Sequence, residues 1–102
     1  MTGFGDLQKM LKSAQEMQER MQKEMAALRR EGSSGGGMVT IILDGQKNVI
    51  SLKLDPEVVN KDDVDMLQDM IMAAFRDAAA KVDEELAQRL GSLGAGLKIP
   101  GL

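Results

Sequence analysis

The stretch DLQKMLKSAQEMQERMQKEMAALRRE, residues 6–31, decides the fold. It contains no Gly or Pro, and most of its residues are strong helix formers. At about 1.5 Å per residue the predicted helix would be roughly 40 Å long, whereas a domain of this size is only about 26 Å across. We therefore expect this helix to project beyond the body that its own chain can build, or to pack on a second chain. Its apolar side chains recur at steps of three, four or seven residues, which is typical of a heptad-like seam: Leu7, Met10, Ala14, Met17, Met21 and Leu28.

The opposite face of this helix is basic. On a helical wheel five of its cations fall within an arc of roughly 80°, and Arg29 lies off that arc. Two interpretations are open. The cations can form a solvated face with i,i+4 ion pairs, which the pattern alone favours, or a basic ridge that contacts the phosphates of a polyanion. The members of the arc are Lys9, Lys12, Arg20, Lys23 and Arg30.

Length and composition predict one small domain. The chain has 102 residues, nine of them Met, with two Phe and no Trp, Tyr or Cys. Flexible Met side chains specify a core loosely, so a modest core and one overlong helix together favour a homodimer. The net charge is −3, yet residues 1–31 carry +1 and residues 56–102 carry −4. Any contact with nucleic acid is therefore expected to be local to the first helix.

The rest of the chain predicts an α+β fold. Residues 32–37 (GSSGGG) lack a phosphate-binding loop pattern, so they are interpreted as a flexible connection or a hairpin tip, whose first half could form a poor edge strand. Two clear strands follow at residues 38–44 and 48–55, separated by an Asp-Gly turn, and one face of the second strand is expected to pack on helix. A second long helix is predicted at residues 62–90, followed by a Gly/Pro tail, residues 91–102, that is too rich in Gly for a helix.

The residue inventory predicts that the protein is not an enzyme. The chain has no His and no Cys, and its serines show no triad-like pattern. Asp62, Asp63 and Asp65 stand at a predicted helix start, where they are interpreted as capping residues and not as metal ligands. No cofactor or small-molecule substrate is predicted. Residues 1–15 have no continuous apolar core, and no apolar run is long enough to span a bilayer, so the expected compartment is the cytoplasm.

Taken in order, several short motifs resemble the YbaB/EbfC family of small bacterial nucleoid-associated proteins. Each motif is weak alone, but together they cover nearly the whole chain without a large insertion. The matching segments are the Met-rich opening of the first helix (Met10, Ala14, Met17, Gln18, Met21), EGSSGGG at 31–37 with MVTI at 38–41, DG at 44–45, LKLDP at 52–56, LQDMIMAAFRDA at 67–78, and KIPG at 98–101.

The resemblance implies an α–β–β–β–α order, with a third strand near residues 29–34, and a homodimer whose helical arms flank DNA. It also implies binding to double-stranded DNA with little sequence preference and a location in the nucleoid. It favours the basic ridge, with Arg29, as the surface that contacts DNA, and the seam as part of the core or the dimer contact. The alternative is a protein–protein adaptor that uses the Met-rich and Ala-rich helix faces without contacting DNA directly.

Overall fold

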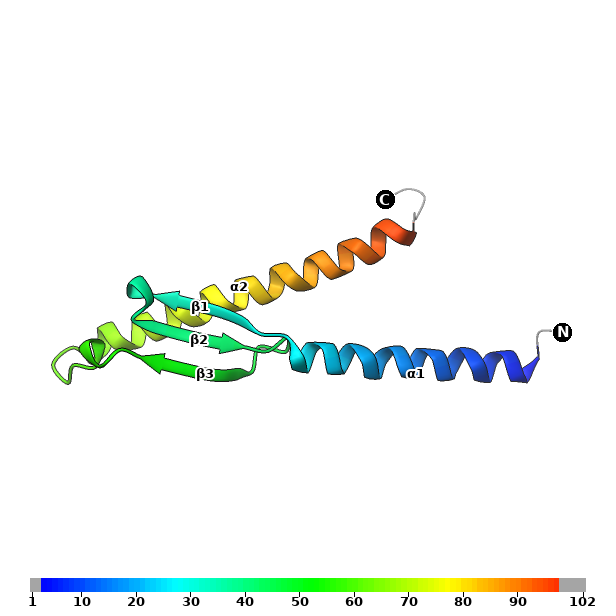
Figure 1. Cartoon of the computed structure of the whole chain (residues 1–102), viewed down its shortest axis with the longest axis horizontal. Helices are drawn as coiled ribbons and strands as arrows, with labels where there is room; N and C mark the ends of the chain where they lie inside the picture. Colours follow the sequence, from blue (N-terminus) through cyan, green and yellow to red (C-terminus); the bar gives the residue numbers. More distant parts are fainter. Residues whose placement is uncertain (1–2, 98–102) are drawn as a thin grey trace.

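Two long helices and a three-stranded antiparallel sheet make up the molecule (Figure 1). The computed structural model describes residues 3–97, and the side chains of residues 3–92. The strand order is β1-β2-β3. This arrangement confirms the predicted α+β class and includes the third strand. The elements are α1 (Phe4–Ala27), β1 (Arg30–Ser34), β2 (Val39–Leu43), β3 (Val49–Leu54) and α2 (Val64–Leu97), with short 3-10 turns η1 (Gly35–Gly37) and η2 (Pro56–Val58).

The molecule is elongated because α1 does not fold back on the sheet. Its principal extents are 74 × 29 × 16 Å and its radius of gyration is 20.3 Å, whereas a compact chain of this length would have about 13 Å. α1 contains no buried residue. Figure 1 shows α1 and the far half of α2 leaving the same end of the sheet and diverging. The first helix thus projects from the body, as its length predicts.

The predicted bounds of the first helix, residues 6–31, were wrong at both ends. α1 starts at Phe4 with Gly3 as N-cap, so Asp6 lies in the first turn and is not the cap. It ends at Ala27, because Leu28 is buried and takes an extended backbone, with φ −64° and ψ 137°. The burial of one leucine therefore stops a helix that local propensity would have continued.

Close packing of β1 on α2 depends on Gly32. A Cβ atom at this position would collide with the backbone of Ala78 and with the carbonyl oxygen of Ala74. Small residues on both elements let the strand lie directly on the helix. The second half of the Gly-rich segment, Gly35–Gly37, forms the hairpin tip, where the φ angles of 60°, 68° and 94° suit glycine.

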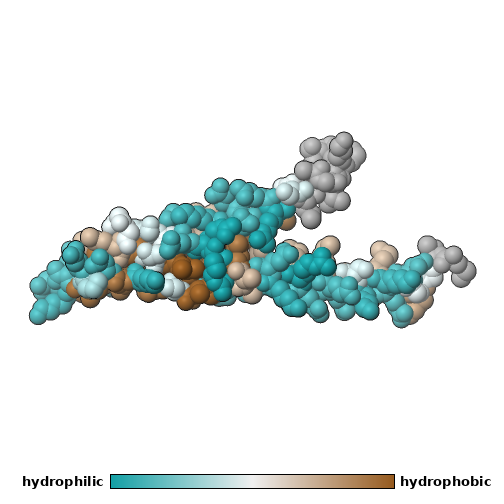
Figure 2. All heavy atoms as spheres, viewed as in Figure 1, coloured by the Kyte–Doolittle hydropathy of each residue, from teal (hydrophilic) through white to brown (hydrophobic). Residues whose placement is uncertain are grey.

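The core lies between α2 and the first two strands. Val39, Ile41 and Leu43 of β2 are buried, and so are three residues of α2, together with Val58. Figure 2 shows hydrophobic side chains gathered over the sheet, whereas the projecting α1 is mainly hydrophilic. The buried residues of α2 are Ala74, Ala78 and Val82.

The face of β3 that continues this core is largely bare. Leu52 pairs with Ile41 and shares its face, yet it is 46 % exposed, and only Leu54 packs at the edge of the core. A helix is about 10 Å wide and strands are about 4.8 Å apart, so one helix covers two strands. The expectation that one face of residues 48–55 packs on helix was therefore wrong for most of β3.

The second helix is longer than predicted at its C-terminal end. Asp63 Oδ1 accepts a hydrogen bond from the backbone N–H of Met66 at 3.2 Å, so Asp63 caps the first turn, as expected. The helix continues to Leu97, so the tail prediction was wrong for residues 91–97. Each interior Gly costs a helix about 1 kcal/mol, but the next Pro is Pro100, so nothing forces an earlier stop. Residues 98–102 lie outside the described part of the chain.

Candidate nucleic-acid interface

Four of the six predicted DNA-contacting residues lie on α1, and we call them the α1 cations: Lys9, Lys12, Arg20 and Lys23. All four are exposed. Between residues 3 and 97, none of the ion pairs involves any of them. The helix is continuous from the first cation to the last, which at about 1.5 Å per residue separates them by about 21 Å along its axis. The phosphates of one DNA strand recur every 3.4 Å or so along the duplex, so this row is long enough to follow several of them.

The other two, Arg29 and Arg30, lie beyond the end of α1, where the helical wheel no longer applies. Arg29 Nη1 donates hydrogen bonds to the carbonyl oxygens of Ala26 at 2.7 Å and Leu28 at 2.9 Å. It therefore satisfies carbonyl groups at the helix end, where a cation also suits the helix dipole. Arg30 Nη2 lies 2.8 Å from Glu85 Oε2. The structure therefore gives both arginines partners within the chain and does not place them in the row of α1 cations.

The predicted seam divides into one buried residue and an exposed stripe. Leu28 is buried, whereas Leu7, Met10, Met17 and Met21 are exposed, and so is Ala14. The seam therefore contributes Leu28 alone to the core of its own chain. Its apolar stripe along α1 remains available to a second molecule.

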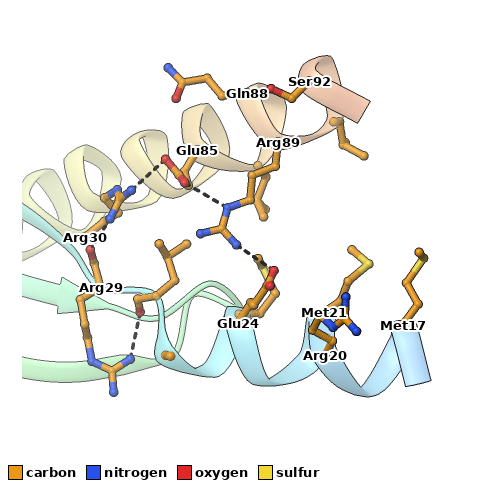
Figure 3. A pocket seen from close by; sticks show the side chains of 15 residues that line it. Met17, Arg20, Met21, Glu24, Arg29, Arg30, Glu85, Gln88, Arg89 and Ser92 are labelled. Carbon is orange, nitrogen blue, oxygen red and sulfur yellow. Dashed lines mark hydrogen bonds and ion pairs between the residues drawn. The ribbon is translucent and has the colours of Figure 1, made fainter. Parts of the chain in front are cut away.

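An open cleft of about 1250 Å³ lies between α1 and the far half of α2 (Figure 3). Met17 and Met21 line it from α1, and Leu86 and Leu90 line it from α2. Figure 3 shows the two helices separating toward their free ends, with Glu24, Arg30, Glu85 and Arg89 nearer the sheet and Arg20 beside Met21 farther out. Met and Leu side chains therefore line much of the walls, together with Arg20, and a cluster of charged residues lies at the base.

Four charged residues of alternating sign form an ion-pair network at that base. Glu85 is central, because Arg30 Nη2 lies 2.8 Å from its Oε2 and Arg89 Nε lies 3.0 Å from its Oε1. Arg89 also reaches across to α1, where its Nη1 lies 3.5 Å from Glu24 Oε2. Hydrogen bonds from Arg89 and then Arg30 lower the pKa of Glu85 below its ordinary value.

The i,i+4 spacing of Glu85 and Arg89 on a predicted helix was the one sequence signal for this network. The contact of Arg89 with Glu24 and that of Arg30 with Glu85 join residues distant in sequence. Only the folded arrangement of the two helices and β1 brings these partners together.

The two outer edges of the sheet differ. At β1, the backbone N–H of Ser33 donates to Asp77 Oδ2 at 3.0 Å, and Lys81 Nζ donates to the carbonyl oxygen of Glu31 at 2.9 Å. Side chains of α2 therefore satisfy backbone groups along that edge. At β3, no fourth strand pairs with the outer edge within residues 3–97. A β-bulge opposite Leu43 and the exposed side chains of Val49 and Ile50 lie along this open strand.

A family model matches residues 3–97, the whole range whose backbone is described, and its description is YbaB/EbfC DNA-binding family. The chain belongs to the YbaB/EbfC DNA-binding family. This confirms the resemblance that the motifs indicate.

Two sequence relatives and one solved structure are similar to this chain. A nucleoid-associated protein of Syntrophobacter fumaroxidans is 44 % identical over 100 residues, which cover 98 % of this chain and 90 % of the relative. One from Dictyoglomus thermophilum is 46 % identical over 92 residues, covering 90 % and 88 %. The crystal structure of the uncharacterized protein HP0035 from Helicobacter pylori has the same fold, with a TM-score of 0.73 at 20 % identity over 91 % of this chain and 98 % of that one. Within the described residues, neither long helix is apolar enough to cross a membrane.

Proposed function

We propose that this chain forms a homodimeric nucleoid-associated protein that binds double-stranded DNA with low sequence specificity through the α1 cations. The observation that carries the proposal is the projecting helix with its exposed row of cations, in a chain of this DNA-binding family. The corresponding location is the bacterial nucleoid.

Phosphate contacts fit this surface better than base readout does. Lys and Arg side chains on a helix reach phosphate oxygens of any sequence and release counterions, which gives affinity that depends steeply on salt. The chain has no Trp or Tyr and two Phe, so it lacks a series of aromatic side chains for stacking single-stranded bases. The net charge of −3 does not prevent this binding, because the acidic excess lies in residues 56–102, away from α1 in the sequence.

Two apolar surfaces support a homodimer. The first is the α1 stripe, with Met10, Met17 and Met21 all more than half exposed. The second is the bare face of β3, where Val49 and Leu52 extend the core face beyond the cover of α2. An open strand edge beside an apolar face is a surface that a second copy can pair with and cover. A symmetric dimer would present two sets of α1 cations, which doubles the number of phosphate contacts.

Fluorescence anisotropy with labelled duplexes of about 30 base pairs tests the DNA contact. Unrelated sequences are expected to bind similarly, with affinity that falls steeply as salt rises. The double reversal Lys12→Glu/Lys23→Glu should weaken binding to every duplex. The matched control is Lys61→Glu, an exposed cation outside both α1 and α2. Equal affinity of the double variant and the control, in proteins with the wild-type oligomeric state, would refute the α1 contact. A folded protein that binds no duplex at low salt would support the adaptor alternative.

Sedimentation equilibrium tests the homodimer. The wild-type chain is expected to sediment as a dimer, and Leu52→Glu should shift it toward the monomer, because the change buries a charge if β3 is covered. Val59→Glu serves as the control, since Val59 is also exposed but follows η2 outside the sheet. A monomeric wild-type protein at all concentrations would contradict the dimer.

A further inference from the structure

A short connection joins α1 to the rest of the chain. Only Leu28 and Arg29 separate the last residue of α1 from the first residue of β1. The helix end is held by the burial of Leu28 and by a hydrogen bond of 2.8 Å from the backbone N–H of Gly45 to the carbonyl oxygen of Met25. These contacts fix where α1 begins its projection, but both lie at its very end.

Arg89 makes a contact one turn further out. Its side chain comes from α2, crosses the base of the cleft and meets Glu24 on α1 (Figure 3). Among the described residues, this is the ion pair that joins the two long helices directly. Beyond it the cleft is open, with Met17, Met21 and Leu90 on its walls.

Arg89 is itself held in place by Glu85. The two residues are one turn apart on α2, and Arg89 Nε lies 3.0 Å from Glu85 Oε1. The second oxygen of Glu85 pairs with Arg30 at the start of β1. Glu85 therefore holds the guanidinium of Arg89 against α2, and the pairing of Glu85 with Arg30 ties both residues to β1.

We propose that Arg89 and Glu85 are positioning residues that set the angle between α1 and α2 and thereby orient the α1 cations for DNA. The part concerning DNA rests on the proposed function, whereas the part concerning the angle does not. An isolated exposed ion pair contributes little to stability, but a network that links three elements next to a short connection constrains their relative orientation. Arg89 is paired with both Glu24 and Glu85. The proposed role therefore does not require Arg89 to contact phosphate.

Distances between spin labels measure this angle directly. The chain has no Cys, so Gln15→Cys on α1 and Ala87→Cys on α2 can be labelled without removing native thiols. Both positions are exposed and neither lines the cleft. Dilution with an excess of unlabelled protein leaves the distance within one chain as the signal. Arg89→Gln removes the link between the helices, Arg89→Lys keeps its charge, and Arg76→Gln removes an exposed α2 cation that has no ion pair among residues 3–97.

The distance distribution should broaden and shift in Arg89→Gln, remain unchanged in Arg76→Gln, and return toward the wild-type distribution in Arg89→Lys. The DNA affinity of Arg89→Gln should fall about two- to tenfold, with partial recovery in Arg89→Lys. An unchanged distribution in Arg89→Gln would overturn the proposal, even if its DNA binding weakened, because Arg89 would then act as a direct contact. If the distance distribution changes in Arg89→Gln but the wild-type protein binds no DNA, the role of Arg89 in setting the angle is supported and the proposed DNA function is refuted.

Discussion

The backbone N–H of Ser33 donates a hydrogen bond to Asp77 Oδ2 at 3.0 Å, so a helix side chain closes the outer edge of β1. Lys81 Nζ lies 3.4 Å from the same oxygen and donates to the carbonyl oxygen of Glu31 at 2.9 Å. Exposed strand edges are templates for pairing with other chains. The sheet is therefore closed on the side where α2 lies and open at β3, which leaves one edge for a second copy.

Replacing Asp77 should weaken this closure. Asp77→Ala leaves the N–H of Ser33 without its partner and is expected to lower the midpoint of thermal unfolding by a few degrees and to promote concentration-dependent aggregation. Light scattering and thermal unfolding measure the two effects. Asp69→Ala is the control, because Asp69 is an exposed α2 carboxylate without a hydrogen bond or ion pair among the described side chains. Equal behaviour of the two variants would contradict the closing role.

Stability should fall in acid. The pKa of Asp44 is lowered mainly by the hydrogen bond from the backbone N–H of Asn48, that of Asp77 by the N–H of Ser33, and that of Glu85 by Arg89. Because its pKa is lowered in the folded protein, each carboxyl group binds fewer protons in the folded than in the unfolded chain at acidic pH. Its contribution is therefore complete above the ordinary pKa values, 3.8 for Asp and 4.5 for Glu, and is lost as pH falls through the lowered values.

Glu85→Gln tests the share of one carboxylate in this dependence. Denaturant unfolding from neutral pH down to about pH 3 should show a shallower loss of stability in the variant than in the wild type, because one group with a lowered pKa is gone. Glu84→Gln is the neighbouring control, since Glu84 is exposed and Glu85 carries the network. Parallel curves for wild type and Glu85→Gln would show that the ion pairs of Glu85 do not persist in solution.

Gly32 should tolerate no side chain. Gly32→Ala would place a methyl group against the backbone of Ala78, so β1 and α2 must separate, and we expect a loss of about 3 kcal/mol in the free energy of unfolding. Gly5→Ala is the matched control: nothing lies within 4 Å of its added Cβ, and Ala in place of Gly in an exposed helix should stabilise it by up to about 1 kcal/mol. Chemical denaturation measures both, and equal stability of the two variants would refute the close contact.

A single α1 cation should change the salt dependence of DNA binding by a countable amount. Lys23→Gln removes one phosphate contact per chain, so the slope of log affinity against log salt should decrease by about 0.9 for each copy in the complex. Lys61→Gln should leave the slope unchanged, because Lys61 lies outside α1. The measurement distinguishes a lost phosphate contact from a loss of folding. Partial unfolding lowers the fraction of protein that can bind DNA, but it does not change the slope of log affinity against log salt.

Periodicity predicted the helices and the two apolar strands because their signals are local. The strand predicted at residues 38–44 appears as β2, with Val39, Ile41 and Leu43 buried, and the helix predicted at residues 62–90 appears within α2, with Ala74, Ala78 and Val82 buried. The residues alone indicated β1 only as a poor edge strand, because they are poor strand formers, and the family resemblance strengthened that prediction. In the structure β1 is held by contacts with α2.

The site was less predictable than the fold. The helical wheel grouped Arg30 with the α1 cations, but the helix stops before it and Glu85 pairs with it. That stop depends on the burial of Leu28, a tertiary contact that no window of sequence contains. The four cations within α1 remained on one helix because nothing interrupts its hydrogen-bond ladder.

The two-residue connection at Leu28 and Arg29 makes α1 a lever arm. A helix of 24 residues is about 36 Å long, so a rotation of about 10° at its base moves its tip by roughly 6 Å. That displacement is close to two phosphate spacings along a DNA strand. Lys9 lies about 27 Å from the base of the helix. The same rotation would therefore shift Lys9 by about 5 Å, roughly one and a half phosphate spacings, and Lys23 by only about 1 Å. The cations near the base would keep their contacts, and those near the tip would adjust to the local width and bend of the duplex.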